Sequence, residues 1–379
     1  MQSLAAEGFA ALKRGDALAA RDLLTRAVQA GKTDAALWFA MAAAHRQLDS
    51  SAEESRALDQ ALKADPNYLP ALIAKGDLFA RLGDERAAGA HYGVALRLAK
   101  SLPILAPEWR DELNRVAAAR QNMSTNFEAH LMSVLAQRGL GEVGTERVAH
   151  AVELLLGKRQ VFLQQPTNFY FPGLPQIEFY DRRDFPWVKG LEMQTPAIRT
   201  EVERILGSDG WAPYIESETR RPNANPLLQD PNWSAFYLIK DGAEVEPNAQ
   251  RCPATMAALC DLPLCRTGRT PAVLFSLLRP GTRIRPHHGF TNIRLICHLP
   301  LIIPEQCALR VGNETRPWRE GEVVVFDDSV EHEAWNLSKE LRVVMIFDVW
   351  RPELSAKERT LIGAMLEAAD TVDRVAQRV

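Results

Sequence analysis

Two stretches decide the fold of the C-terminal half: residues 272–299, AVLFSLLRPGTRIRPHHGFTNIRLICHL, and residues 322–350, EVVVFDDSVEHEAWNLSKELRVVMIFDVW. Val, Ile and Phe dominate their apolar runs, as in buried strands, and turn residues such as Pro280-Gly281 separate the runs. This pattern predicts four strands, at residues 272–279, 293–302, 322–327 and 341–350. Several short strands separated by turns are typical of a jelly roll or a barrel.

Four of the eight histidines lie between positions 287 and 332 of this region. His287 stands at a predicted strand end, after Arg285-Pro286, and His332 follows the apolar strand at 322–327. Two imidazoles at the ends of neighbouring strands can converge on one divalent metal, and neutral imidazole suits Fe, Zn, Cu or Ni better than Mg or Ca. A single histidine after a strand is more often an ordinary surface or core residue. The spacing alone therefore leaves a metal site and a structural role equally open.

The residues around these histidines carry a more specific signal. The chain contains Phe275-Ser276, Arg279-Pro280-Gly281-Thr282, Pro286-His287, Gly289, Thr291-Asn292, Arg294-Leu295, His298-Leu299, Phe326-Asp327-Asp328-Ser329, Glu331-His332-Glu333 and Asp348-Val349-Trp350. Together these motifs resemble the aspartyl/asparaginyl β-hydroxylase family of 2-oxoglutarate-dependent oxygenases. The resemblance covers about half of the chain and is dense over residues 270–352. It implies a double-stranded β-helix, or jelly-roll, core.

The resemblance also implies a role for each matching residue. His287 and His332 match the two histidines that bind Fe(II), and Gly289 stands where most 2-oxoglutarate oxygenases have a carboxylate ligand. Arg342 matches the arginine that binds the distal carboxylate of 2-oxoglutarate, a role that suits the two-donor fork of a guanidinium. Two further residues match positions beside the cosubstrate: Ser276 and His298. With O₂ as the second cosubstrate, the implied reaction hydroxylates an unactivated C–H bond, with the β-carbon of Asp or Asn in a peptide or protein as the favoured target.

One position departs from the family pattern, Arg-x-Arg-x-His. The chain has Arg294-Leu295-Ile296-Cys297-His298, so Ile296 replaces the second arginine, which in the family helps to bind the cosubstrate. Arg294 lies on the same face of the strand as Ile296 and His298, so it is placed to compensate and to bind 2-oxoglutarate. Arg283 and Arg285 stay open as alternatives for this compensation. Contact of the metal with His288, Asp327 or Asp328 stays open.

Three alternatives to a protein hydroxylase stay open. The substrate can be a free amino acid or a small natural product, or the domain can be a degenerate, non-catalytic binding module fused to a scaffold. Succinate formation from 2-oxoglutarate separates a catalyst from a binding module. A zinc hydrolase is a third interpretation, but the sequence offers it neither a third ligand nor an evident base. The arginine pairs Arg182-Arg183 and Arg220-Arg221 lie in predicted loops that can flank a substrate.

The first hundred residues repeat with a period of 34. Positions in register carry the same kind of residue: Gly8, Ala42 and Gly76; Leu24, Leu58 and Tyr92; Ala27, Ala61 and Ala95; Gly15, Asp49 and Gly83; and Ala20 with Ala88, a column that Glu54 interrupts. Small residues at fixed positions let paired helices pack closely. The pattern resembles the tetratricopeptide repeat, whose concave face usually binds a peptide or protein; an ordinary helical bundle is the alternative.

The predicted fold is multidomain α plus β: helical repeats at 1–100, connecting or capping helices at 101–158, a jelly-roll oxygenase domain with flanking helices at 159–352, and a C-terminal helix at 353–379. In the last of these, Ser355 and Glu358 predict a capping box. An apolar stripe is predicted along the same helix, at Leu361, Ile362, Met365, Leu366 and Ala369.

Composition narrows the class of protein. The formal net charge of −3 gives no field that favours nucleic acid or an anionic membrane. Residues 1–20 lack a signal-peptide pattern, and no window approaches 18 uninterrupted apolar residues. The five cysteines have neither CxxC spacing nor an even count. We therefore expect a cytoplasmic protein that binds neither nucleic acid nor membrane.

Overall fold

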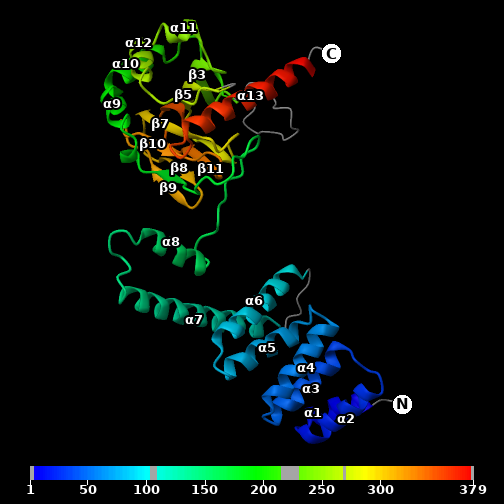
Figure 1. The fold of residues 1–379 in the computed structure, drawn as a ribbon. Coiled ribbons are helices and arrows are strands. Elements are labelled where there is room, and N and C mark those ends of the chain that lie inside the picture. Colours follow the sequence, from blue (N-terminus) through cyan, green and yellow to red (C-terminus); the bar gives the residue numbers. More distant parts are fainter. Residues whose placement is uncertain (1–3, 103–108, 215–229, 268–269, 377–379) are drawn as a thin grey trace. The chain divides into compact units, whose positions relative to one another are not determined.

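The computed structural model describes residues 4–102, 109–214, 230–267 and 270–376 (Figure 1). The chain divides into two compact units, Met1–Lys158 and Arg159–Val379. In the described residues the first unit is entirely helical, and the second contains all of the strands. The fold is therefore α plus β, as the sequence predicts.

The first unit begins with three pairs of antiparallel helices. Their bounds are α1 Leu4–Lys13, α2 Ala17–Gln29, α3 Ala35–Gln47, α4 Ser51–Ala64, α5 Leu69–Arg81 and α6 Glu85–Ser101. The turn within each pair contains a residue with positive φ: Gly15 (81°), Asp49 (51°) and Gly83 (78°). Glycine and, less often, Asp adopt this conformation at low cost. The three turns stand at the repeat positions predicted from the sequence.

Close packing explains the small-residue columns. A Cβ atom on Gly8 would lie 2.8 Å from the side chain of Leu24, and one on Gly76 would lie 2.4 Å from the ring of Tyr92. Glu54, which interrupts the Ala20–Ala88 column, is buried, and its carboxylate forms an ion pair with Arg81 at 2.6 Å. The repeat is therefore a packing pattern with one polar substitution that is compensated.

Two longer elements follow the repeats: α7, Trp109–Ala136, and α8, Glu146–Leu155. Helices were predicted for this region, and α7 packs on α6 through Leu113 and Val116. None of the helices in the described ranges combines the length and the apolar character that a membrane crossing requires.

The second unit contains two antiparallel sheets. The larger has the order β1-β10-β7-β12-β5-β3-β2, with β4 beside β3, and the smaller has the order β6-β11-β8-β9. The bounds of the strands are β1 Phe179–Tyr180, β2 Ala212–Pro213, β3 Trp233–Lys240, β4 Ala243–Glu244, β5 Val273–Leu278, β6 Thr282–His287, β7 Arg294–Ile302, β8 Cys307–Val311, β9 Glu314–Pro317, β10 Val324–Phe326, β11 His332–Asn336 and β12 Arg342–Trp350.

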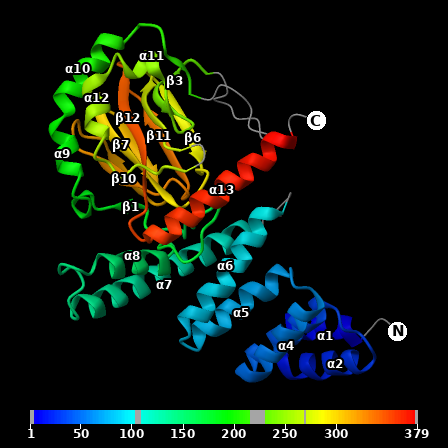
Figure 2. The same cartoon turned by 45° about the horizontal axis from the view of Figure 1, so that its top comes forward.

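The two sheets share one apolar core. Leu278 and Val344 of the large sheet pack with Ile284, Leu309 and other residues of the small sheet. The opposite face of the large sheet is covered by helices (Figure 2): α9 Val188–Met193, α10 Thr195–Ile205 and α12 Pro253–Leu259. Alternate side chains of the central strands thus face either the helices or the space between the sheets. The second unit therefore has a layered core of two antiparallel sheets, with helices on the outer face of the larger one.

The predicted strands match β5, β7, β10 and β12, with bounds that differ by up to two residues. The capping box is also confirmed, because Ser355 and Glu358 exchange hydrogen bonds before the last helix, α13, Ala356–Ala376. The apolar stripe on α13 was predicted too wide. Ile362 and Leu366 pack against the domain, but Leu361 is 59% exposed and Met365 46% exposed. The small cluster beneath α13 covers only one edge of the helix.

Candidate active site

His287 and His332 face each other across neighbouring strands. They are direct partners in the β6–β11 pairing, with their ring centroids 4.1 Å apart. Further along, Ala334 pairs with Ile284, so β6 has one residue more than β11 between the two pairs. Such a bulge changes the face to which the following side chains point. It brings His287 to the inner face shared by Ile284, where strict alternation would have directed it away.

Each of the two imidazoles has one nitrogen engaged and one available. His287 Nδ1 lies 2.8 Å from the carbonyl of Arg285, and His332 Nδ1 lies 3.1 Å from the carbonyl of Val330. Because a carbonyl can only accept, both Nδ1 atoms carry the proton, and each Nε2 keeps a lone pair. His332 is buried, and burial lowers the pKa of its imidazole well below the ordinary value; His287 keeps an exposed surface, but desolvation lowers the pKa of its imidazole too. Both rings are therefore neutral near pH 7, the form that binds a metal.

Gly289 has no room for a side chain. A Cβ atom there would lie 2.0 Å from Oδ2 of Asp328, and its N–H donates to the Asp328 carbonyl at 2.6 Å. Burial raises the pKa of the Asp328 carboxyl to about 7, so it is readily protonated. The position two residues after His287 is thus closed to any carboxylate-bearing residue. Among the described residues, no group of three or more His, Cys, Asp or Glu side chains is arranged to hold a metal.

Arg342 is a buried cation without an acidic partner among the described residues. Its side chain is 1% exposed, its NH1 donates to the Ser276 carbonyl at 3.4 Å, and its Nε has no hydrogen-bond partner. The guanidinium lies over the ring of Trp318 at 4.9 Å. Burial lowers its pKa from 12.5 to about 10, so the group stays charged at neutral pH. An unpaired buried charge is costly, so this position calls for an anion.

Further polar groups without partners surround Arg342. The Nδ1 atom of His298 and the Nε1 atom of Trp318 are both buried and unbonded, and their rings lie 5.8 Å apart. Burial, and then the charge of Arg342, lowers the pKa of His298 to about 3, so its imidazole is neutral. Ser276 Oγ accepts from Trp233 Nε1 at 3.1 Å and keeps its own proton for another acceptor. These groups together offer several donors to one small polar ligand.

Arg294, Ile296 and His298 lie on the face of β7 that is directed between the sheets, as predicted. Leu295 and Cys297 pack with the helix-covered core instead. The charge of Arg294 is balanced, since its NH1 pairs with Asp348 and its NH2 lies 3.8 Å from Asp328. Its buried Nε has no partner and remains a donor.

The remaining candidates are placed as follows. His288 is partly exposed and is not a partner in the β6–β11 pairing. Arg182 pairs with Glu192 at 2.8 Å and Arg183 with Asp181 at 2.5 Å, so both have local partners. The pair Arg220-Arg221 lies outside the described residues. The sequence analysis did not single out Trp233 or Trp318, because an isolated tryptophan carries no spacing signal.

Comparison with known proteins supports the sequence resemblance. The family model for aspartyl/asparaginyl β-hydroxylase matches residues 192–352. The chain is 35% identical over 208 residues to the ornithine lipid ester-linked acyl 2-hydroxylase of Rhizobium tropici. The aligned region covers 54% of this chain and 71% of that protein. It is 40% identical over 182 residues to the mouse aspartyl/asparaginyl β-hydroxylase, covering 47% of this chain but only 23% of the mouse protein.

The solved structures that resemble this chain are helical repeat proteins, and they cover about a third of it. One is the type III secretion translocator chaperone SycD of Yersinia enterocolitica, with 13% identity, a TM-score of 0.31, and coverage of 33% of this chain and 83% of that one. Another is the TPR2B domain of yeast Sti1, with 19% identity, a TM-score of 0.29, and coverage of 31% and 94%.

Proposed function

Because the chain belongs to the aspartyl/asparaginyl β-hydroxylase family, we propose that residues 159–352 form an Fe(II)- and 2-oxoglutarate-dependent hydroxylase domain. His287 and His332 hold the metal through Nε2. Arg342 binds the distal carboxylate of 2-oxoglutarate, and Ser276, His298 and Arg294 line the same pocket. The reaction consumes R–H, O₂ and 2-oxoglutarate and yields R–OH, succinate and CO₂.

The residues present fit both groups. Two neutral histidines with free Nε2 atoms suit Fe(II), and the closed position at Gly289 leaves coordination sites for small ligands. The cosubstrate is a dicarboxylate, and Arg342 is a buried guanidinium without a carboxylate partner among the described residues. This unpaired cation is the observation that carries the proposal, because only a bound anion compensates its burial.

The side chains of this domain bind, orient and exclude water. The hydroxyl of Ser276 is held by Trp233 and is aimed by that contact, and Trp318 covers one face of the Arg342 guanidinium. His298 stays neutral and offers a hydrogen bond without adding a second charge. Ile296 leaves an apolar surface where the family pattern has an arginine. These side chains therefore carry one uncompensated positive charge among them, on Arg342, which matches one carboxylate.

Succinate formation tests the proposal directly. The purified full chain is incubated with Fe(II), 2-oxoglutarate and O₂, with and without candidate substrates, and succinate is measured by mass spectrometry. We expect iron-dependent succinate in the unaltered chain and none in His287→Ala or His332→Ala, because either change removes one of two protein ligands. Iron-independent succinate, or full activity in either variant, would contradict the proposed site. Circular dichroism of the variants checks that the fold persists.

The favoured substrate is the β-carbon of Asp or Asn in a polypeptide. The mouse relative is named for that activity. A second candidate is an acyl chain, since the Rhizobium tropici relative is named an acyl 2-hydroxylase and Ile296 makes the pocket wall apolar. Substrate-stimulated succinate formation with an Asp- or Asn-containing peptide, compared with an acylated amino acid, distinguishes the two.

The helical repeats offer a second binding surface. A hollow of about 380 Å³ is lined by Phe39, Ile73 and Trp109 from α3, α5 and α7, with Arg46, Asp77 and Glu112 beside them. The first helices of the second and third pairs contribute to it, together with the start of α7, as on the concave face of a tetratricopeptide array. We therefore propose a peptide or protein partner for residues 1–100, with residues 101–158 completing the groove.

A further inference from the structure

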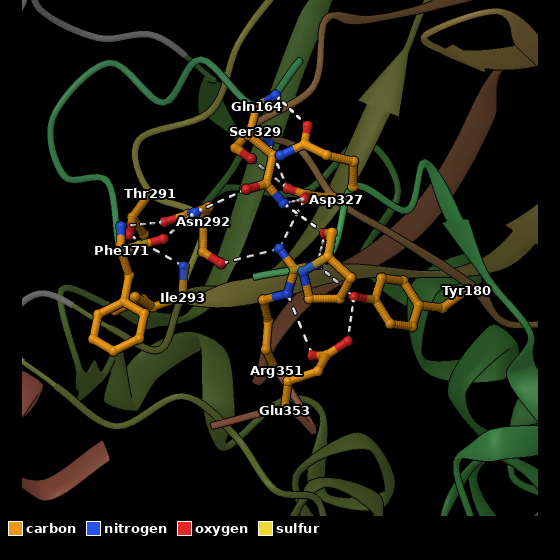
Figure 3. A network of polar contacts seen from close by, with 12 residues as sticks. Gln164, Phe171, Tyr180, Thr291, Asn292, Ile293, Asp327, Ser329, Arg351 and Glu353 are labelled. Carbon is orange, nitrogen blue, oxygen red and sulfur yellow. Dashed lines mark hydrogen bonds and ion pairs between the residues drawn. The ribbon is translucent and has the colours of Figure 1, made fainter. Parts of the chain in front are cut away.

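A buried polar network joins four segments of the second unit that are far apart in the sequence (Figure 3). Its centre is the ion pair between Asp327 and Arg351, at 2.9 Å, in which both side chains are 0% exposed. Around the pair lie Gln164 and Asn292, buried to 6% and 0% exposure. We call Gln164, Asn292, Asp327 and Arg351 the polar clasp. None of these side chains belongs to the proposed metal or cosubstrate contacts.

The clasp fixes the turn that leads into His332. Asp327 Oδ1 accepts from the backbone N–H and the hydroxyl of Ser329, at 3.0 and 2.6 Å, while Oδ2 accepts from Gln164 and Arg351. The next residue, Val330, supplies the carbonyl that engages His332 Nδ1. The side chain of Asp327 thus accepts four hydrogen bonds at a position only five residues before His332.

The same clasp fixes the loop that follows His287. Asn292 Nδ2 donates to Gln164 Oε1 at 2.9 Å, and the Asn292 carbonyl accepts from Arg351 at 3.2 Å. The segment that begins at Gln164 also bonds both loops through its backbone. The N–H of Gln165 donates to the Ser329 carbonyl at 2.7 Å, and the N–H of Thr167 donates to the Gly289 carbonyl at 2.9 Å. One segment therefore holds both histidine loops.

We propose that the polar clasp positions the metal site, by keeping the loops of His287 and His332 at the separation that a shared metal requires. A buried ion pair adds little net stability compared with apolar packing, but it fixes geometry, because any displacement leaves a charge uncompensated. Two ligands tolerate displacement less than three or four, so outer contacts that aim the histidines have a large effect on affinity. This inference rests on the proposed function, since it assumes that His287 and His332 bind a metal.

A matched pair of variants tests the proposal. Asp327→Asn removes the charge at the centre of the clasp. Glu201→Gln is the control, because Glu201 is also a buried carboxylate (2% exposed) that accepts three hydrogen bonds, from Ala254 and Thr255 at the start of α12. Mn(II) binding to the full chain is measured by electron paramagnetic resonance, and thermal unfolding is measured in parallel. We expect both variants to unfold at lower temperature. Only Asp327→Asn should weaken Mn(II) binding, by roughly 10- to 100-fold.

The outcomes separate the two proposals. Mn(II) affinity within twofold of the unaltered chain in Asp327→Asn would overturn the positioning role and leave the metal site standing. Failure of the unaltered chain to bind Mn(II) would overturn both. If Asp327→Asn does not fold, Gln164→Ala replaces it, because this change cuts the link between the loops without leaving a buried charge; unchanged Mn(II) affinity in that variant counts against the clasp equally. Asp327→Glu, which keeps the charge, should recover part of the lost affinity.

Discussion

Two fully buried arginines of the second unit predict opposite effects of the same substitution. Arg342 has no acidic partner in the part of the chain that the structure describes, whereas Arg351 pairs with Asp327. Burial lowers the pKa of Arg342 from 12.5 to about 10, which corresponds to a cost of roughly 3 kcal/mol for keeping the charge in the folded state. Arg342→Met removes that charge and keeps most of the packing on Trp318. We therefore expect it to raise the free energy of unfolding of the ligand-free chain, by about 1–3 kcal/mol.

The same substitution should nearly abolish cosubstrate binding. Losing the partner of a buried carboxylate costs about 3–5 kcal/mol, or roughly two to four decades in the Kd for 2-oxoglutarate. The unaltered chain should gain about 2.7 kcal/mol of stability at a 2-oxoglutarate concentration of 100 Kd. Arg342→Met should gain almost none at that concentration. Stability and affinity thus change in opposite directions.

Urea unfolding and calorimetric titration measure the two quantities, both with Mn(II) present and O₂ excluded. Arg351→Met is the matched control. It leaves Asp327 charged and unpaired, so it should lower the free energy of unfolding by about 3–5 kcal/mol. If ligand-free Arg342→Met lost as much stability as Arg351→Met, this would refute the claim that the buried charge of Arg342 destabilises the ligand-free fold. An unchanged affinity for 2-oxoglutarate would place the cosubstrate elsewhere.

Three further predictions concern pH, packing and the repeats. Burial lowers the pKa of His298 from 6.5 to about 3 in the folded chain. Between pH 3 and pH 6.5 this residue is therefore protonated in the unfolded chain but not in the folded chain. As pH falls below 6.5, this residue should lower the free energy of unfolding of the metal-free chain by about 1.4 kcal/mol per pH unit. Urea unfolding at pH 7 and pH 5 measures this loss, and the loss should be smaller in His298→Gln than in the unaltered chain. Gly76→Ala should destabilise the first unit by about 1–3 kcal/mol, because the new Cβ meets the Tyr92 ring, whereas Gly89→Ala, with nothing within 4 Å, should be neutral or stabilising in thermal unfolding. Trp109→Ala should slow hydroxylation of a long polypeptide and leave that of a short peptide unchanged; equal effects on both would show that the hollow does not select the substrate.

The repeats and the main strands were predictable because local rules specify them. Gly15, Asp49 and Gly83 mark turns whose positive φ follows from the residue types themselves. The apolar runs at β5, β7, β10 and β12 identify strands, and their alternation places Arg294 and His298 on one face. The stripe on α13 was predicted too wide, because periodicity shows which residues share a helix face but not how much of that face a neighbour covers.

The sequence alone determined the repeat period, the central strands and the pair of histidines that the family resemblance singles out. Only the tertiary structure decided that His287 faces inward, because the extra residue in β6 is defined by pairing with β11 and leaves no mark in the pattern of residue types. The same holds for Asp327 and Arg351, which pair across 24 positions, and for Arg342, whose lack of an acidic partner among the described residues emerges only when its neighbours in space are known. Periodicity records the direction of a side chain along its own element. Register, burial and charge balance depend on contacts between elements, and these form only when the chain is folded.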